Sequence, residues 1–388
     1  MKHSGSKNIL IFNGSGDLYG ANRILSNTVY SLIDKYNITL YLPVSGPLTD
    51  YIQFNNPAIK ITIFKFFPLI HRQMRSLGGI FELVFNTFRF IIHILYDYKF
   101  FKSFDLIFIN TLSCTPLILI FKLFGFRVVL HVHEILSNED TFTHIINRLA
   151  LRFSDSIIGV SKQVSTNLRK AYGSGKYQIK VSTIWNGIED MLIKQERPAK
   201  TKVIFTLFGR IKREKGQWLL LDAISLLPSN CAQNAIFRFI GSPLSMDDPA
   251  YHNWLKQVDK LRLSSGIGIE VINFVPDISI YLNETDVLLV PSIMQDPFPT
   301  VILEGLSAGK VVVASDRGGS TESIDDQLTG ILFNPADVQS LQVILTDLII
   351  NFGDYSDIQS RARASYLEKF TIDEYKNNIR FYFEALLS

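Results

Sequence analysis

Carboxylates and glycines recur in two neighbouring loops of the C-terminal half of the chain. Asp296 and Glu304 lie eight residues apart around a Pro-Phe-Pro turn, and the pair Gly318-Gly319 follows with Glu322 close behind. Carboxylates accept hydrogen bonds from vicinal diols, which ribose and hexoses share. The backbone N–H groups of a glycine turn can reach a phosphate. We therefore expect this half to bind a sugar carried on a nucleoside diphosphate.

A third loop, upstream of these, carries cations. The predicted strand Val203–Phe208 is followed by residues 209–216, GRIKREKG, in which four cations lie within six residues. Cations at the end of a strand suit a diphosphate, although their order is not the GxxxxGK[ST] of a Walker A loop. Arg210 and Lys215 are our candidates, and we expect Lys212 and Arg213 at the surface. A solvated basic turn is the alternative.

The N-terminal half has a glycine-rich turn after its first predicted strand. The sequence from Gly14 to Gly20, GSGDLYG, can cradle a phosphate or a carbonyl group at a helix N-terminus. It is not the GxGxxG of NAD-binding proteins, because Tyr19 takes the third glycine position and no acidic residue ends the second predicted strand, 38–43. We expect Gly16 to contribute to a ligand site, with a tight structural turn as the alternative.

Two histidines end a further predicted strand, Val128–Val132. The sequence is His131-Val132-His133-Glu134. Alternation along the strand puts His131 on the face of Val129, in the core, whereas His133 lies past the strand end, where open α/β sheets bind ligands. His133 is therefore our candidate for contacting the reacting sugar. The pair could also hold a metal, but no further His/Cys cluster supports that, and we expect no metal site.

Composition indicates a globular chain of two domains. The chain has 388 residues, of which 47% are hydrophobic, and only two cysteines, neither in a CxxC pair. We expect neither a disulfide framework nor a zinc site, which fits a reducing cytosol. The apolar run near Met1 is four residues long, too short for a signal peptide.

The two halves differ in charge. Residues 1–185 hold 20 Lys and Arg against 10 Asp and Glu, a net charge of +10, whereas residues 186–388 hold 19 against 26, a net charge of −7. A basic half can attract phosphorylated ligands, anionic lipid or nucleic acid. We do not expect nucleic acid, because no helix-turn-helix, zinc-finger or RNP motif accompanies the charge.

Short apolar runs rich in β-branched residues alternate with amphipathic stretches along the whole chain. This pattern is typical of βαβ units with parallel sheets. The predicted domains are 1–185 and 186–370, with a turn at Asn186-Gly187, a charged linker to about residue 200, and a terminal helix, 371–388. The predicted strands are Asn8–Asn13, Ile38–Pro43, Leu106–Asn110, Val128–Val132, Ser156–Val160, Val203–Phe208, Ile236–Ile240, Ile269–Phe274, Val287–Val290 and Val311–Ala314.

The segment Ile80–Lys102 is unusually apolar and aromatic. Glu82, Asn86, Arg89 and His93 recur on one face, so we predict one amphipathic helix and not a membrane span. It is either a core helix of the first domain or an interfacial helix that touches anionic lipid. The flanking cations that favour the second interpretation are Lys65, Arg72, Arg75, Lys99 and Lys102.

Taken together, the motifs resemble those of the GT-B glycosyltransferases of the large retaining family 4, also called glycosyl transferases group 1. The resemblance covers nearly the whole chain. Its most specific parts are GRIKREKG at 209–216, DPFPTVILEG at 296–305 and GGSTE at 318–322, with support from WNGIED at 185–190, GVSKQV at 159–164 and DLYGANR at 17–23. It implies an α/β chain of two Rossmann-like domains whose parallel sheets face a central cleft. In this family the first domain binds the acceptor, the second binds the nucleotide sugar, and the terminal helix crosses back to the first.

The resemblance also implies roles for particular residues. Arg210 and Lys215 resemble the pair that binds the diphosphate, and Glu304 resembles the carboxylate that holds the ribose. Asp296 would contact the donor sugar, and His133 would lie near it. The catalytic residues implied are His133, Arg210, Lys215 and Asp296. The donor-binding residues implied are Gly16, Arg210, Lys215, Asp296, Phe298, Pro299, Thr300, Glu304, Gly318 and Gly319.

Two positions depart from the family pattern. Asp296 stands where the family usually has glutamate, and Pro299 replaces a glycine. We expect these changes to bear on which donor sugar is used. The resemblance implies transfer with retained configuration, by front-face attack and without metal or cofactor, from a UDP- or GDP-sugar to a saccharide.

The acceptor, the location and two rival activities complete the expectations. We expect a lipid-linked acceptor in cell-surface polysaccharide synthesis, and a cytoplasmic protein, peripheral on the cytoplasmic face of the inner membrane through residues 65–102. An inactive sugar-nucleotide-binding scaffold, with Asp296 as its lesion, is one alternative. A GT-B sugar-nucleotide epimerase is the other, although the first domain has few acids that could serve it.

Overall fold

The computed structural model describes residues 6–70, 76–136, 141–172, 180–192, 202–335 and 337–388. The chain divides into two compact units, which we call unit 1, Met1–Asn186 with Asp373–Ser388, and unit 2, Gly187–Ile372. Arg72, Arg75 and most of the predicted linker lie outside the described residues. The predicted turn at Asn186-Gly187 is wrong, because these residues continue an irregular segment without a turn, and both are buried.

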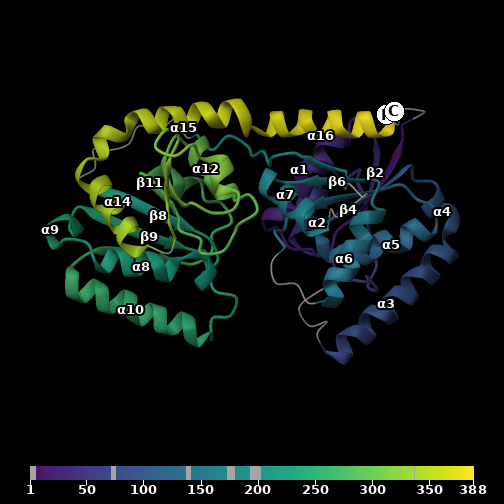
Figure 1. Cartoon of the computed structure of the whole chain (residues 1–388), viewed down its shortest axis with the longest axis horizontal. Helices are drawn as coiled ribbons and strands as arrows, with labels where there is room; N and C mark the ends of the chain where they lie inside the picture. The colour runs from purple at the N-terminus through teal and green to yellow at the C-terminus, as the bar shows by residue number, and fades with distance from the viewer. Residues whose placement is uncertain (1–5, 71–75, 137–140, 173–179, 193–201, 336) are drawn as a thin grey trace. The chain divides into compact units, whose positions relative to one another are not determined.

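Unit 1 contains a sheet of seven parallel strands in the order β3-β2-β1-β4-β5-β6-β7 (Figure 1). The strands are β1 Asn8–Phe12, β2 Asn37–Leu42, β3 Lys60–Ile63, β4 Leu106–Asn110, β5 Val128–Val132, β6 Ser156–Gly159 and β7 Val181–Thr183. The helices are α1 Gly20–Leu32, α2 Pro47–Asn55, α3 Leu77–Tyr96, α4 Tyr98–Lys102, α5 Thr115–Leu123, α6 Thr141–Phe153, α7 Lys162–Tyr172 and α16 Ile372–Leu387, with a 3₁₀ turn, η2, at Leu112–Cys114.

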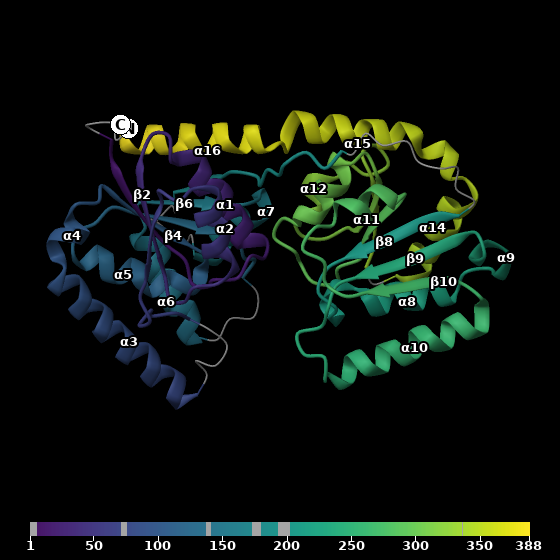
Figure 2. The same cartoon turned by 180° about the vertical axis from the view of Figure 1, so that it is seen from behind.

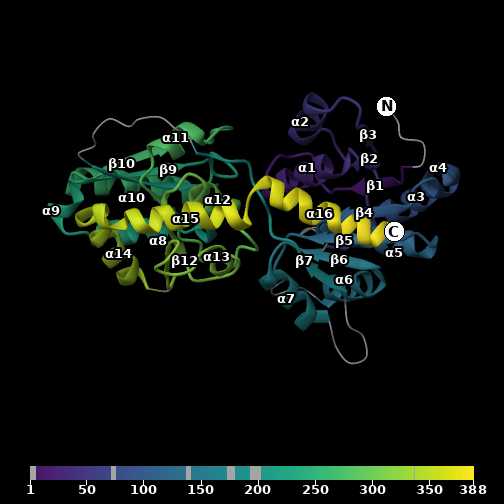
Figure 3. The same ribbon diagram turned by 90° about the horizontal axis from the view of Figure 1, so that it is seen from above.

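The C-terminal helix α16 packs on unit 1. Figure 3 shows it beside β4, and the rings of Phe383 and Phe108 lie 5.6 Å apart there. The hydroxyl groups of Tyr375 and Thr28 are 2.7 Å apart, and Arg380 Nη2 lies 2.9 Å from Asp34 Oδ2. Residues 373–388 are thus part of the fold of unit 1, although they end the chain.

Unit 2 contains a sheet of six parallel strands in the order β10-β9-β8-β11-β12-β13 (Figure 2). The strands are β8 Val203–Phe208, β9 Ala235–Ile240, β10 Gly268–Ile272, β11 Val287–Val290, β12 Val311–Ser315 and β13 Ile331–Phe333. The helices are α8 Gln217–Ser225, α9 Ser229–Ala232, α10 Pro249–Ser265, α11 Ser279–Glu284, α12 Thr300–Ser307, α13 Ser320–Ser323, α14 Val338–Ile350 and α15 Ser356–Lys369, with 3₁₀ turns η3 Arg213–Lys215 and η4 Phe352–Tyr355.

Both sheets reverse direction of build-up at their centre. In unit 1 the chain moves outward from β1 to β3 and then returns to place β4 on the other side of β1. Unit 2 does the same with β8 and β11. Open α/β sheets bind ligands at the carboxyl ends of the two strands that flank such a point, because the following loops diverge there. The loops after β1, β4, β8 and β11 are therefore the places where a site is expected.

All ten predicted strands are present, with ends that differ by at most two residues. They were recognisable because strands such as β4 and β5 are buried along their whole length. The strands β3, β7 and β13 were missed. Each lies at an edge of its sheet and has only three or four residues, so it lacks the continuous apolar run that marks a central strand.

The predicted helix Ile80–Lys102 is two helices. The first, α3, ends at Tyr96, and α4 begins at Tyr98. Asp97 between them has φ −102° and ψ 30°, which interrupts the helical path. The prediction of one continuous helix is therefore wrong at this residue.

Candidate functional site

The cation loop of unit 2 is held tightly between two neighbouring loops. After β8, Gly209 has φ 146°, and the carbonyl oxygen of Arg210 accepts a hydrogen bond of 3.0 Å from Gln217 Nε2. Gly216 has φ 84°, and a Cβ atom there would lie 1.8 Å from the carbonyl oxygen of Pro291. Only glycine lets this loop lie against the segment that follows β11. The loops on both sides of the strand-order reversal are thereby brought into contact.

This contact brings together a predicted cation and a predicted carboxylate. Lys215 Nζ and Asp296 Oδ2 lie 2.6 Å apart, although they are 81 residues apart in sequence. Both side chains are partly exposed, Lys215 at 32% and Asp296 at 17%. The pair therefore stands at a surface that a ligand can reach, with positive and negative charge side by side.

The paired glycines support the Asp296 loop from the other side. Gly319 N donates to the carbonyl oxygen of Asp296 at 2.8 Å. Gly318 has φ 61°, and a Cβ atom there would lie 2.5 Å from the same oxygen. On Gly319 a Cβ atom would lie 2.3 Å from the carbonyl oxygen of Pro297. Because the turn after β12 touches the backbone of this loop, it fixes where the Asp296 side chain begins.

Helix α12 starts directly after the Pro-Phe-Pro turn. Pro299 is its N-cap residue and Thr300 its first residue, and no side chain caps its N-terminus. The expectation that Thr300 caps this helix is therefore wrong. Phe298 is buried and lies 5.9 Å, centroid to centroid, from Phe370, so it anchors the loop in the interior.

Glu304 lies just over one turn into α12 and is buried, with 8% of its surface exposed. Gly305 follows it, and a Cβ atom at Gly305 would lie 2.4 Å from Leu288 Cδ2 in β11. The glycine lets α12 approach the sheet closely. This fixes the helix, and with it the Glu304 carboxylate, relative to the strand ends.

In unit 1 the glycine turn after β1 contacts the loop after β2. A Cβ atom on Gly16 would lie 2.9 Å from the carbonyl oxygen of Val44, and Leu48 N donates to the carbonyl oxygen of Gly16 at 3.0 Å. Asp17 Oδ1 accepts hydrogen bonds from Tyr19 N and from Asn22 Nδ2, at 3.1 and 2.9 Å. These contacts give the glycines and Asp17 structural duties at the sheet edge where Gly16 was expected to meet a ligand.

His133 begins a chain of hydrogen bonds along the carboxyl edge of unit 1. Its Nε2 lies 2.9 Å from Asn110 Oδ1, whose amide group donates to Asn13 Oδ1 at 2.9 Å. Asn13 in turn donates to the carbonyl oxygen of Ser15 at 2.7 Å. Since an amide oxygen only accepts, His133 carries its proton on Nε2. The chain ties the loops after β1, β4 and β5 together and fixes the orientation of the imidazole.

Burial shifts the pKa values of the two neighbouring groups in opposite directions. Desolvation lowers the pKa of His133 to about 3, so the ring is neutral. Desolvation also raises the pKa of Glu134 to about 7, although hydrogen bonds from the backbone N–H groups of His133 and Leu112 oppose that rise. Glu134 therefore titrates close to neutral pH.

Sequence reasoning named His133 but missed Asn13, Asn110 and Glu134. Two asparagines that end or follow adjacent buried strands were the available signal. Thr111 was also missed. It has φ 72° and ψ 153°, a conformation that side chains other than glycine rarely adopt, and it precedes the Leu112 N–H that points at Glu134.

His131 is fully buried, as predicted from strand alternation. Neither ring nitrogen has a hydrogen-bond partner among the described residues, and burial holds the pKa of this group well below its ordinary value. Its ring centroid lies 4.1 Å from that of His133. Within the described ranges, no group of three or more His, Cys, Asp or Glu side chains is placed to hold a metal ion.

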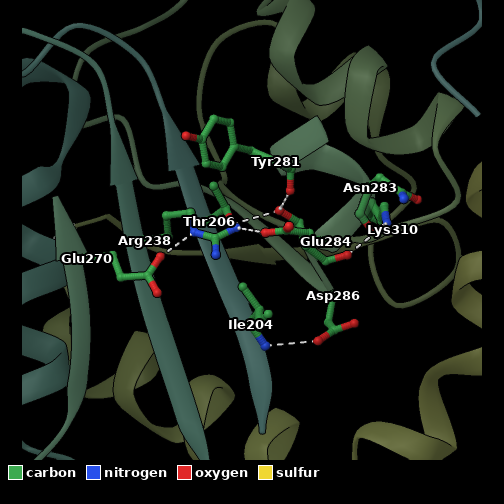
Figure 4. Close-up of polar contacts among 10 residues, drawn as sticks. Ile204, Thr206, Arg238, Glu270, Tyr281, Asn283, Glu284, Asp286 and Lys310 are labelled. Carbon is green, nitrogen blue, oxygen red and sulfur yellow. Dashed lines mark hydrogen bonds and ion pairs between the residues drawn. The ribbon is translucent and has the colours of Figure 1, made fainter. Parts of the chain in front are cut away.

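Two acids of unit 2, Glu284 and Asp286, are occupied at the opposite, amino edge of the sheet. Glu284 pairs with the nearly buried Arg238, which also pairs with Glu270, at 2.8 and 2.6 Å (Figure 4). Asp286 Oδ2 accepts a hydrogen bond of 2.9 Å from Ile204 N. These acids stabilise the sheet on the side away from the ligand loops.

The fold and the site together define a class of protein. Unit 1 and unit 2 are both Rossmann-like, with parallel sheets and loops of chemical character at the point where strand order reverses. In unit 2 that point gathers a cation loop, a carboxylate loop and a glycine turn, the groups that suit a sugar on a diphosphate.

Comparison with known proteins agrees with this class. Residues 189–365 match the model of the family described as "Glycosyl transferases group 1". The structure of Anabaena HepE in complex with UDP and glucose matches with a TM-score of 0.79 and 22% identity, over 98% of this chain and 100% of that one. These findings confirm the resemblance to group 1 glycosyltransferases and the GT-B fold of two Rossmann-like domains.

Two curated relatives set the range of similarity. Glycogen synthase of Mycobacterium tuberculosis is 27% identical over 57% of this chain, which spans about half, 51%, of the length of that relative. The UDP-Gal:alpha-D-GlcNAc-diphosphoundecaprenol alpha-1,3-galactosyltransferase of Escherichia coli is 22% identical over 79% of this chain and 78% of its own length.

Proposed function

We propose that this protein is a glycosyltransferase that moves a sugar from a nucleoside-diphosphate donor to a hydroxyl group of a saccharide acceptor. The observation that carries the proposal is the contact between the loops after β8, β11 and β12. It places Lys215 2.6 Å from Asp296 and sets the Gly318-Gly319 turn against the backbone of Asp296. Cations for a diphosphate and a carboxylate for sugar hydroxyls thus share one surface.

The mechanism follows from the charges of these groups. The barrier to transfer is the departure of the diphosphate, which leaves oxocarbenium character on the sugar. Arg210 and Lys215 would neutralise the leaving diphosphate, which is the electrostatic stabilisation that lowers such a barrier most. Because these side chains supply the positive charge, we propose that no metal or other cofactor is needed. The resemblance supports a retaining, front-face reaction in which the leaving phosphate takes the acceptor proton.

For the donor, we propose a UDP-sugar first and a GDP-sugar second. Glu304 would bind the ribose hydroxyls and Asp296 those of the transferred sugar. The solved structures of HepE contain UDP with glucose and UDP-glucose, which supports uridine for this chain. Asp296 is one methylene shorter than glutamate, so the sugar must approach the loop more closely or present a different hydroxyl pattern.

For the acceptor, we propose a lipid-linked saccharide used in cell-surface polysaccharide synthesis. The Escherichia coli relative acts, by its name, on a diphosphoundecaprenol-linked sugar. The net charge of +10 over residues 1–185 would favour such an anionic lipid acceptor. We propose that the protein is cytoplasmic and works at the cytoplasmic face of the inner membrane, which it contacts through residues 65–102.

A panel of UDP-, GDP-, ADP- and dTDP-sugars tests the proposal. Thermal shift and slow donor hydrolysis are scored together, since a ligand that binds only the folded state raises its apparent stability. One donor is expected to give both signals. Arg210→Ala should lose both, because it removes a cation that holds the diphosphate.

Arg213→Ala is the matched control on the same loop. Arg213 is exposed and lies over the Trp218 ring, 5.1 Å from its centroid. This variant should keep both signals. Stabilisation without turnover, even with lipid-linked acceptors added, would instead favour the inactive scaffold. A change of configuration in the free sugar nucleotide would identify the epimerase.

A further inference from the structure

Helix α3 presents a continuous apolar stripe to solvent on the outside of unit 1 (Figures 1 and 2). Its members recur at intervals of three or four residues, which places them along one face of the helix. Their exposed fractions range from 38% to 88%. They are Leu77, Ile80, Phe81, Val84, Phe88, Ile92 and Leu95.

The opposite face of α3 already anchors the helix. Phe90 is fully buried among the rings of Phe12, Phe67 and Phe121, with centroid distances of 5.9 Å in each case. His93 stacks on Phe64 at 4.3 Å. The stripe is therefore not needed to attach the helix, and its exposure is not a consequence of loose packing.

This arrangement differs from the one expected from the sequence. Asn86 and His93 belong to the polar face, which would meet water if α3 were an ordinary surface helix. Instead, Asn86 donates to the carbonyl oxygen of Phe67 at 3.2 Å, and His93 packs among aromatic rings. Part of the polar face thus turns toward the unit while the apolar stripe faces outward. A contiguous apolar surface of this kind marks an interaction site.

The charges beside the stripe indicate its partner. Among the described residues between 65 and 102, the cations Lys65, Arg89, Lys99 and Lys102 outnumber the carboxylates Glu82 and Asp97. All four cations are exposed. Arg89 lies over the Phe66 ring at 4.6 Å, which holds its charge near the edge of the stripe. Apolar side chains flanked by cations are complementary to a membrane surface that contains anionic lipid.

Two other occupants fit less well. Leu77–Tyr96 is long and apolar enough to cross a membrane, but its inner face is packed against the sheet side of unit 1 through Phe90, so spanning would require unpacking it. A second copy of this chain would bring the same cations together across a symmetric interface, and like charges in contact disfavour association.

We propose that α3 lies in the plane of an anionic membrane surface, with this stripe inserted among the lipid chains and the four cations at the headgroups. The inference deepens the peripheral contact in the proposed function and rests on that function only for its purpose, which is to bring unit 1 to a lipid-linked acceptor. Membrane binding is measured without donor or acceptor, so its failure and a failure of sugar transfer are distinguishable.

Flotation of the full chain with vesicles tests the inference. The vesicles contain phosphatidylcholine alone or with 30 mol% phosphatidylglycerol (about one third anionic, to provide a surface potential). Wild type should bind the anionic vesicles and bind the neutral ones weakly. The triple variant Phe81→Ser, Phe88→Ser, Leu95→Ser should reduce the partition coefficient by about 100-fold, because three large apolar side chains no longer leave water.

The matched control replaces three equally exposed apolar residues that lie outside the stripe, with Leu244→Ser, Leu263→Ser and Phe381→Ser. Their exposed fractions are 83%, 89% and 75%. This variant should bind vesicles as wild type does. A second variant, Lys65→Glu, Lys99→Glu, Lys102→Glu, should lose binding to anionic vesicles while its weak binding to neutral ones is unchanged. Thermal unfolding of each variant shows that the chain remains folded.

Equal partitioning of the stripe variant and wild type would overturn the inference. So would a dimer of the wild-type chain, seen by sedimentation without vesicles, that the stripe variant loses and that vesicles do not dissociate. That outcome would assign the stripe to a second copy.

Discussion

Replacing Gly318 by alanine should disable the proposed site while leaving unit 2 folded. Gly318 has φ 61°, and a Cβ atom there would lie 2.5 Å from the carbonyl oxygen and 2.9 Å from the backbone nitrogen of Asp296. Both obstacles are backbone atoms, so no side chain can rotate away to relieve the contact. The Asp296 loop must move instead.

The size of the effect follows from these distances. A left-handed alanine costs about 1 kcal/mol, which lowers the Tm of a domain of this size by about 2–4 °C. The Asp296 oxygen must also retreat by about 0.9 Å to reach ordinary contact, and a misplacement of about 1 Å in a reactive site can reduce the rate about 100-fold. Because Asp296 pairs with Lys215, both groups would be displaced.

Gly309 offers a closely matched control in the same unit. Its φ is 63°, and a Cβ atom there would meet nothing nearer than Gln359 O at 3.9 Å. Gly309→Ala therefore has the same conformational cost without the collision. Both variants should lose a similar few degrees in Tm, but only Gly318→Ala should lose about 100-fold in kcat/KM for donor turnover.

The assay is donor hydrolysis or sugar transfer over a range of donor concentrations, with thermal unfolding of the same preparations. If Gly318→Ala is no less active than Gly309→Ala, then the turn does not set the position of Asp296 in the reacting complex, and the reasoning is refuted. If Gly318→Ala loses far more stability than the control, the collision is absorbed by unfolding and not by the loop.

Three further predictions concern single side chains. Asp296→Asn removes the charge partner of Lys215, 2.6 Å away, and should lower kcat/KM by about tenfold or more; unchanged kinetics would show that the ion pair is incidental. Glu134 has its pKa raised to about 7 in the folded state. Its contribution to stability is therefore full below about pH 4.5 and is lost as the pH rises toward 7. Glu134→Gln should become more stable relative to wild type over that interval in thermal unfolding, and a constant difference would contradict the cited shift. Lys310 is buried, and its Nζ donates to the carbonyl oxygens of Asn283 and Thr285 at 3.0 and 2.8 Å (Figure 4). Lys310→Met leaves two carbonyl groups unpaired, at about 1–3 kcal/mol each, and should lower Tm by several degrees without changing donor affinity; a variant as stable as wild type would mean that these carbonyl groups find other partners.

The sequence alone predicted the central strands and the general character of the site. Strands such as Leu106–Asn110 and Val128–Val132 are buried on both faces, so their continuous apolar runs are visible without any knowledge of the fold. The chemistry of the site was visible for a related reason. Arg210, Lys215 and Asp296 follow recognisable strands directly, and residues after parallel strands share one edge of the sheet.

The short edge strands, the break at Asp97 and the chain of hydrogen bonds from His133 to Ser15 could not be predicted in the same way. Each depends on partners that are distant in sequence, such as Asn13 and Asn110, which are 97 residues apart. Local patterns carry no information about such pairs.

What the sequence by itself determined was therefore the alternation of strands and helices and the residue types at the strand ends, because both are local. Only the tertiary structure decided that Lys215 touches Asp296 and that the Gly318 turn supports the Asp296 backbone. It also decided which way α3 faces. The amphipathic period defined an apolar stripe, but packing of Phe90 against Phe12 and Phe121 turned the opposite face inward and left the stripe in solvent.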